Sequence, residues 1–72
     1  MTTFTATFSN GKTITRNNKT GRTYSHAWAT FGPLGGVMQT GFSSSAEAAD
    51  RAARAYLKFV GHVRHEVVEA TA

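Results

Sequence analysis

The sequence predicts an α+β fold in which an antiparallel sheet of three to four strands packs against one long carboxy-terminal amphipathic helix, in the order ββββα. Three observations predict it. Polar and apolar residues alternate in short runs before position 43, turn-forming residues separate these runs, and apolar residues recur at three- and four-residue steps after a serine cluster. In a chain of 72 residues we expect one small domain, with a basic sheet over residues 1–42 and a capped helix over residues 43–70.

The first two predicted strands form a hairpin. Thr3–Phe8 alternates threonine with apolar residues, Ser9–Gly11 is a turn, and Lys12–Arg16 is the second strand. A three-residue turn with a glycine bulge pairs Ala6 with Ile14 and keeps the apolar side chains on one side, whereas a two-residue turn places Ile14 on the opposite side. We therefore expect the three-residue turn.

The longest predicted strand, Arg22–Phe31, has two very different faces, because successive side chains in a strand point to opposite sides. One face is cationic and aromatic and consists of Arg22, Tyr24, His26, Trp28 and Thr30. The other face is small and mostly apolar and consists of Thr23, Ser25, Ala27, Ala29 and Phe31.

The length of the preceding loop decides which of these faces is buried. A four-residue loop, Asn18–Gly21, places the small face in the core with Ile14 and leaves the large face free, whereas three or five residues reverse the two faces. We favour the four-residue loop because Ala27 and Ala29 offer a flat surface to an alanine-rich helix. The alternative is Trp28 in the core, since a lone tryptophan in a small domain is commonly buried.

A fourth strand and a long helix complete the prediction. Val37–Phe42 follows a glycine-rich break, and Ser44 with Glu47 then forms a capping box. Apolar residues recur on one helical face at Ala49, Ala52, Ala53, Tyr56, Val60, Val63 and Val67. We expect one helix from about Ser45 to Val68, which crosses Gly61, although this glycine is also able to end the helix in a left-handed cap.

The net charge of +4 is unevenly distributed along the chain. Residues 1–42 carry Lys12, Arg16, Lys19 and Arg22 and no acid, whereas residues 43–72 carry four cations and four acids. A surface of one sign attracts polyanions, and nucleic acid is the commonest of them. The predicted sheet is therefore the part expected to meet a charged partner.

Size and composition argue against several classes of protein. A deep catalytic pocket would remove core that a 72-residue chain needs, so we do not expect an enzyme. The absence of cysteine excludes disulfides and thiolate metal ligands. His62, His65 and Glu66 have the spacing of a metal site on a helix, but no further well-spaced ligand supports them, and we expect neither a metal nor a cofactor.

No secretory signal is visible at the amino terminus, and no apolar run approaches the roughly 20 residues that a membrane span needs. We therefore expect a cytoplasmic protein without a membrane partner.

The sheet-to-helix junction carries a resemblance to a known family. A basic antiparallel sheet with a tryptophan is followed by Gly-Phe-Ser-Ser-Ser-Ala-Glu-Ala-Ala-Asp-Arg-Ala-Ala-Arg-Ala-Tyr. Residues 22–60 in this way resemble DNA-binding domains of the AP2 type and of integrase amino-terminal regions. The resemblance implies that an exposed sheet face enters the major groove and that its contacts come from Arg22, Tyr24, His26 and Trp28. The sequence departs from that pattern in its additional first hairpin and in Val37–Thr40, which has no Arg or Lys.

These observations predict a non-enzymatic nucleic-acid-binding accessory protein of the kind that phages and mobile elements encode. The candidate contact residues are Lys12, Arg16, Lys19, Arg22, Tyr24, His26 and Trp28. The same side chains suit protein recognition, so the alternative is a phage-encoded inhibitor, similar in kind to anti-CRISPR proteins, that binds a host defence protein or nucleoprotein complex. A third hypothesis is a homodimer that completes its core with this sheet face.

Overall fold

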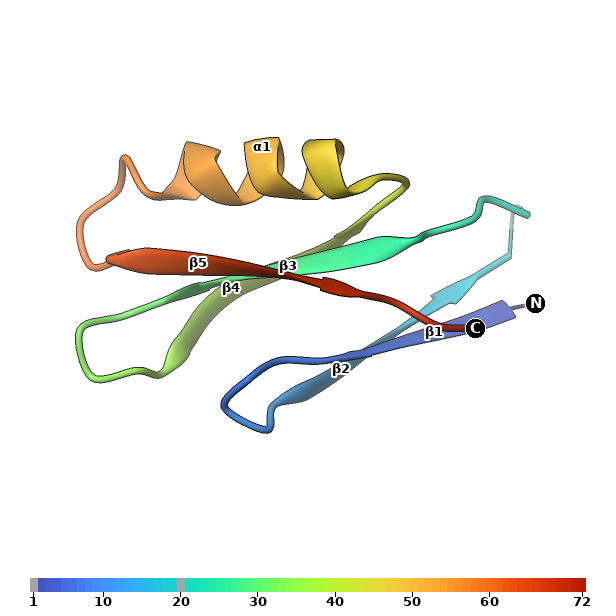
Figure 1. The fold of residues 1–72 in the computed structure, drawn as a ribbon, viewed down its shortest axis with the longest axis horizontal. Helices are drawn as coiled ribbons and strands as arrows, with labels where there is room; N and C mark the ends of the chain where they lie inside the picture. Colours follow the sequence, from blue (N-terminus) through green and yellow to red (C-terminus); the bar gives the residue numbers. More distant parts are fainter. Residues whose placement is uncertain (1, 20) are drawn as a thin grey trace.

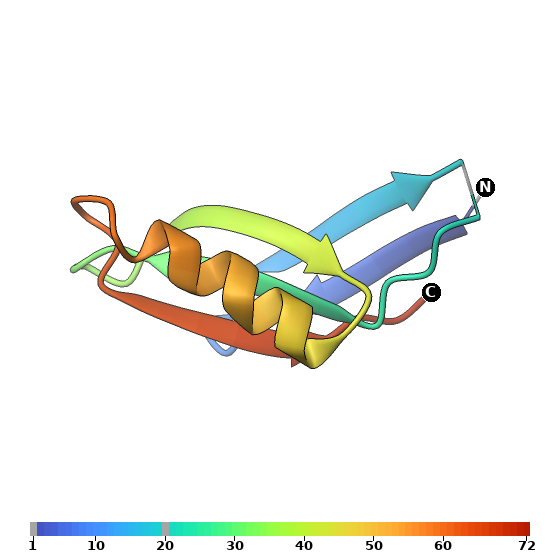
Figure 2. The same ribbon diagram turned by 90° about the horizontal axis from the view of Figure 1, so that it is seen from above.

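Residues 2–19 and 21–72 are described by a computed structural model, in which two antiparallel sheets and one helix form three layers (Figure 1). The elements in chain order are β1 (Thr2–Thr7), β2 (Thr13–Asn18), β3 (His26–Phe31), β4 (Val37–Ser43), α1 (Ala46–Tyr56) and β5 (Arg64–Glu69). β1 pairs with β2, and the second sheet has the order β4-β3-β5. The helix α1 covers one face of this second sheet, and the β1–β2 hairpin lies on its other face (Figures 1 and 2).

The α+β class and the antiparallel strands are confirmed. The single sheet of three to four strands and the order ββββα are wrong, because a fifth strand follows the helix and the strands divide between two sheets. Residues 43–70 accordingly hold the end of β4, a short helix and β5 in place of one long helix.

The first hairpin is confirmed in detail. Gly11 has a left-handed φ of +88°, and its N–H donates to the Phe8 carbonyl over 2.9 Å. The N–H of Phe8 in turn donates to the Lys12 carbonyl over 2.9 Å, and Ala6 faces Ile14 across the two strands. The glycine bulge thus sets the register that places the apolar side chains of the hairpin on one side.

The third strand is shorter than predicted and does not pair with the second. β3 begins at His26, and β2 and β3 belong to different sheets. The predicted loop Asn18–Gly21 includes Thr20, which lies outside the described residues. Because β2 and β3 share no backbone ladder, the length of their connection does not decide which face of β3 is buried.

Both faces of β3 are buried, since β3 is the middle strand of its sheet and a separate layer covers each side. Toward the hairpin, Ala27, Ala29 and Phe31 pack against Ala6 and Phe8. The expectation of one buried and one free face is therefore wrong, and so is the expected contact of Ala27 and Ala29 with the helix. An exposed sheet face of the kind that the family resemblance implied is absent at β3.

Trp28 fills the other side of β3, toward α1. It is 6% exposed and packs against Ala49 and Ala53 of the helix. Its ring stacks on the Tyr56 ring with a centroid distance of 5.3 Å and an angle of 26°. Across the sheet it faces Gly41 of β4, where an added Cβ would come within 2.6 Å of the indole ring. The glycine is what allows the ring to lie against the backbone of β4.

The helix starts close to the predicted position but ends a dozen residues before it. Its N-cap is Ser45 and not Ser44, and the Ser45 hydroxyl accepts a hydrogen bond from the Ala48 N–H over 3.1 Å. The helix ends at Tyr56, and Gly61 adopts a left-handed φ of +95° in the connection to β5. The prediction of one helix from Ser45 to Val68 is wrong.

The packing of β5 explains why its sequence also matched the predicted helix. Val67 packs toward α1 and Val68 packs toward the hairpin, as adjacent residues of a strand buried on both sides do. Val63 and Val67 also lie four residues apart, which matches one face of a helix. Pairing with β3 decides between the two conformations, and valine favours the strand.

Among residues 2–19 and 21–72, no helix combines the length and the apolar character that crossing a bilayer requires.

The close packing of Trp28 on β4 gives a test of the core. Gly41→Ala is expected to lower the free energy of unfolding by about 1–3 kcal/mol, because the new methyl group must displace the indole ring or the β4 backbone. Gly36→Ala is the matched control, since an added Cβ there meets nothing within 4 Å and Gly36 is not left-handed. It should change the stability by less than about 0.5 kcal/mol. Urea denaturation followed by tryptophan fluorescence measures both variants, and equal stabilities would contradict the packing described.

Candidate nucleic-acid interface

Three cations gather at one end of the molecule, which we call the basic end: Arg16, Lys19 and Arg22. Arg16 is in β2, Lys19 directly follows this strand, and Arg22 is in the irregular stretch before β3. All three are exposed, and with Asn17, Asn18 and Tyr24 they line a hollow of about 300 Å³. Gly21, with a left-handed φ of +78°, lies in the connection that carries Lys19 and Arg22.

Tyr24 fixes the position of the stretch before β3. It is 8% exposed, and its ring meets the Phe4 ring edge-on at a centroid distance of 5.3 Å. The Phe42 ring lies at 5.8 Å, and the Arg16 guanidinium carbon lies 5.4 Å from the Tyr24 ring centroid, within cation–π range. Tyr24 thereby ties the basic end to both sheets.

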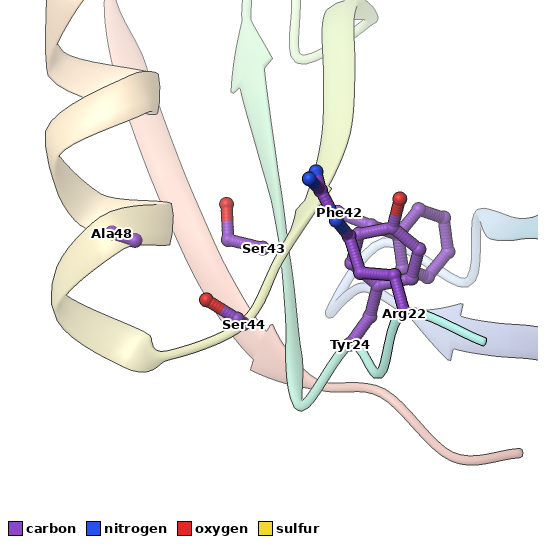
Figure 3. A pocket seen from close by; sticks show the side chains of 6 residues that line it. All are labelled: Arg22, Tyr24, Phe42, Ser43, Ser44 and Ala48. Atoms are coloured by element: carbon purple, nitrogen blue, oxygen red, sulfur yellow. The ribbon is translucent and has the colours of Figure 1, made fainter. Parts of the chain in front are cut away.

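A second, larger hollow of about 460 Å³ adjoins the first and shares Arg22 and Tyr24 with it. Its other lining residues come from the end of β4 and the start of the helix, and they are Phe42, Ser43, Ser44 and Ala48. Figure 3 shows the Arg22 guanidinium and the Tyr24 hydroxyl extending to the same side of the hollow, with the Ser43 and Ser44 side chains between them and α1.

The electrostatic character of this end is positive. Glu47 is the first acid in the sequence, and its side chain is not among the six that line the larger hollow. The first turn of α1 adds partial positive charge, because its first N–H groups have no intrahelical acceptor before them. Ser45 accepts from the Ala48 N–H with its hydroxyl and from the Ala49 N–H with its carbonyl. Arginine, lysine, hydroxyl and N–H groups are all donors to oxyanions.

The structure brings together four of the seven candidate residues, namely Arg16, Lys19, Arg22 and Tyr24. Lys12 is exposed at the turn of the hairpin, at the opposite end of β2 from Lys19. His26 is half-buried, and its Nδ1 lies 2.8 Å from the Ser25 hydroxyl. Trp28 lies in the core under α1 and presents no exposed ring face.

Sequence reasoning missed Phe42, Ser43, Ser44 and Ala48 as lining residues. The serine cluster was visible, but its spacing from Glu47 indicated only a helix cap. That this cap lies beside Arg22 follows from the pairing of β3 with β4, which places His26 opposite Ser43.

The three residues considered for a metal site make other contacts. His62 Nδ1 lies 2.8 Å from the Thr30 hydroxyl, and His65 Nε2 lies 2.8 Å from the Asp50 carboxylate on α1. Glu66 points to the other face of β5, toward the hairpin. In the part of the chain that the structure describes, no three side chains of the metal-ligating types gather into a site.

Asp50 holds α1 against β5. The hydrogen bond from His65 lowers the pKa of the Asp50 carboxyl below its usual value, and Arg54, whose Nε lies 2.7 Å away, contributes to the same direction.

Glu66 fastens the turn of the hairpin to β5. One carboxylate oxygen accepts from the Ser9 N–H over 2.7 Å, and the other accepts from the Ser9 hydroxyl over 2.5 Å. Burial raises the pKa of Glu66, but these hydrogen bonds and Arg64 at 3.8 Å outweigh it, so its pKa lies below the usual value. Backbone hydrogen bonds between Thr5 and Thr71, of 2.7 and 2.9 Å, attach β1 to the chain beyond β5. The hairpin that carries Arg16 is thus held in place at two points.

No family model, curated protein or solved structure matches the chain.

The contacts of Glu66 predict a dependence of stability on pH. A carboxyl group whose pKa is lowered by folding stabilises the protein above its unfolded pKa of roughly 4.3, and this stabilisation is lost as the pH falls through the folded value. The melting temperature of the unmodified protein should therefore fall between about pH 5 and pH 3. Glu66→Gln should melt about 4–8 °C lower than the unmodified protein at neutral pH, for a loss of about 1 kcal/mol in the free energy of unfolding. Its melting temperature should fall less than that of the unmodified protein on acidification.

Glu69→Gln provides the control, because Glu69 is an exposed acid of the same strand. Circular dichroism melts over this pH range measure all three proteins. An acid-induced decrease in Glu66→Gln as large as that of the unmodified protein would show that Glu66 does not fasten the hairpin.

Proposed function

We propose that the protein is a non-enzymatic nucleic-acid-binding accessory protein that holds the phosphate backbone at its basic end. One observation carries the proposal. Arg16, Lys19 and Arg22 line the smaller hollow, Arg22 also lines the larger one, and neither hollow has a carboxylate among its lining residues. Such an arrangement suits the row of negative charges along a phosphate backbone.

Burial of Trp28 supports contacts with the backbone over contacts with the bases. Stacking on bases needs an exposed aromatic ring, and Trp28 is under the helix while the Tyr24 ring is packed between two phenylalanines. The remaining exposed groups are cations, amides and hydroxyls, which bind phosphate oxygens without reading the sequence. The proposed binding is therefore insensitive to base sequence.

Binding at the basic end predicts a strong dependence on salt. If three cations neutralise three phosphates, the affinity for a short oligonucleotide should fall with a log–log slope of about 2–3 in salt concentration. Removing the charges of Lys19 and Arg22 together, as Lys19→Ala with Arg22→Ala, should lower this slope by about 2. Fluorescence anisotropy with a labelled oligonucleotide that lacks terminal phosphates measures the slope.

Lys12→Ala combined with Arg51→Ala is the matched control. It removes the same net charge from exposed positions outside the basic end, and the slope should stay close to that of the unmodified protein. Equal effects of the two double variants would mean that net charge alone governs binding, and a flat salt dependence in the unmodified protein would exclude the proposal.

A second candidate function, protein binding by an inhibitor or adaptor, is favoured by the opposite end of the molecule. All five exposed large apolar side chains of the described residues lie there, and we call them the apolar end: Leu34, Met38, Phe59, Val60 and Val63. They come from the β3–β4 turn, the start of β4 and the α1–β5 connection, which meet where Gly32 and Gly61 approach Met38 (Figure 1). Leu34 is 100% exposed and Val60 is 99% exposed.

Exposed apolar groups that are contiguous mark interaction surfaces. Lys58 lies in the α1–β5 connection, Arg64 begins β5, and both are exposed, so the partner expected is a protein with an apolar surface and an acidic rim.

Leu34→Ser combined with Val60→Ser tests the second candidate. The double variant should fold as stably as the unmodified protein, because both side chains are almost wholly exposed. A protein partner captured from cell extract at high salt should be lost, and after identification and purification it should bind the double variant at least about tenfold more weakly. Retention of the same partner by the double variant would contradict this function. Self-association that the double substitution abolishes, seen by light scattering, would identify a second copy as the occupant instead.

A further inference from the structure

The larger hollow is lined by a buried tyrosine, Tyr24, whose solvent-accessible hydroxyl has no partner among the described residues. Tyr24 is more than nine-tenths buried, yet its hydroxyl makes no hydrogen bond to any of residues 2–19 or 21–72. Its oxygen is not sealed from solvent, and Tyr24 lines the hollow, where its hydroxyl extends to the same side as the Arg22 guanidinium (Figure 3). A tyrosine buried to this extent usually finds a partner for its hydroxyl. The position is therefore suited to a hydrogen bond with a group from outside the chain.

The other polar groups around the hollow are donors as well. Arg22 contributes a guanidinium with five N–H donors, and Ser43 and Ser44 contribute hydroxyls. The first turn of α1 reaches the hollow at Ala48, whose own N–H is bonded to Ser45, so this turn contributes the partial positive charge at the amino-terminal end of an 11-residue helix. No carboxylate lines the hollow. A guanidinium and hydroxyl donors that line one hollow are complementary to a tetrahedral oxyanion.

We propose that this hollow is a binding site for one phosphate group, held by the Arg22 guanidinium and the Tyr24 hydroxyl at the amino-terminal end of α1. The proposal rests on the proposed nucleic-acid function and deepens it, because it assigns one phosphate of the bound chain to a defined pocket. A phosphate of the nucleic-acid backbone, a terminal phosphate and free phosphate share this chemistry.

The β4–α1 connection and the stretch that carries Arg22 and Tyr24 are held together before any ligand binds. Ser25, next to Tyr24, donates its N–H to the Ser43 carbonyl over 3.1 Å and its hydroxyl to the Ser44 carbonyl over 2.8 Å. These bonds fix the β4–α1 connection against the stretch that carries Arg22 and Tyr24. The Tyr24 ring is further restrained by Phe4 and Phe42. A site with donors fixed in this way loses little conformational freedom on binding.

Titration of the ¹⁵N-labelled protein with inorganic phosphate, at constant ionic strength against chloride, tests the site by NMR. Saturable shifts are expected for the backbone amides from Ser44 to Ala48 and for the Arg22 side-chain N–H. Tyr24→Phe removes the hydroxyl and keeps the ring, and it should weaken phosphate binding by about tenfold. Arg22→Gln should weaken it by at least about tenfold.

Tyr56→Phe and Arg51→Gln are the matched controls, because both residues lie in α1 and neither lines the hollow. They should leave phosphate binding unchanged. Shifts that do not saturate, shifts that chloride reproduces, or an unchanged affinity in Tyr24→Phe would each overturn the proposal.

Oligonucleotides with and without a terminal phosphate show whether the phosphate in the hollow is a backbone phosphate or a terminal one. If Tyr24→Phe weakens both, a backbone phosphate occupies the hollow, and if it weakens only the phosphorylated one, a terminal phosphate does. An oligonucleotide that binds with steep salt dependence while phosphate leaves the hollow unperturbed would overturn this inference alone. A phosphate response without oligonucleotide binding at any salt concentration would overturn the nucleic-acid function and leave the phosphate site standing.

Discussion

The burial of β3 on both faces is the constraint on which the rest of the structure depends. A central strand between two layers needs small residues where a layer comes close and a large one where a gap must be filled. Ala27 and Ala29 allow the hairpin to approach, and Trp28 fills the space under α1. Gly41 then has to be small, because the indole ring lies against its backbone. Each layer is therefore matched to the alternation of side chains along this one strand.

Covering both faces of the central strand leaves the two ends of the molecule as its distinctive surfaces. At one end, β2 stops and an irregular stretch leads into β3, which gathers Arg16, Lys19 and Arg22 and brings Arg22 beside the start of α1. At the other end, two connections expose Leu34 and Val60. Side chains in connections are less constrained by core packing than those in strands, so connections can carry cations or apolar groups that a partner recognises. The basic end and the apolar end therefore both result from a core that covers both faces of β3.

The hairpin is a separate sheet, and its position depends on contacts between residues far apart in the sequence. Glu66 bonds Ser9, Thr71 pairs with Thr5, and Tyr24 packs on Phe4. A two-stranded ribbon has little stability by itself, so it needs this attachment and its apolar face to stay folded. The placement of Arg16 relative to Arg22 consequently depends on core packing as much as on the local turn.

The sequence by itself determined the features that local chemistry controls. Gly11 and the alternation of Phe4, Ala6 and Phe8 set the turn and register of the hairpin, the serine cluster marked the start of α1 to within a residue, and the missing acids before Glu47 marked the positive part of the chain. Only the tertiary structure decided the state of Arg64–Glu69, because its valines fit a helical face and a two-sided strand equally well until β3 pairs with them. It also decided that Trp28 is buried and that the helix cap borders Arg22. Those outcomes depend on which strands become neighbours, and contacts between distant segments leave no short-range pattern in a single sequence.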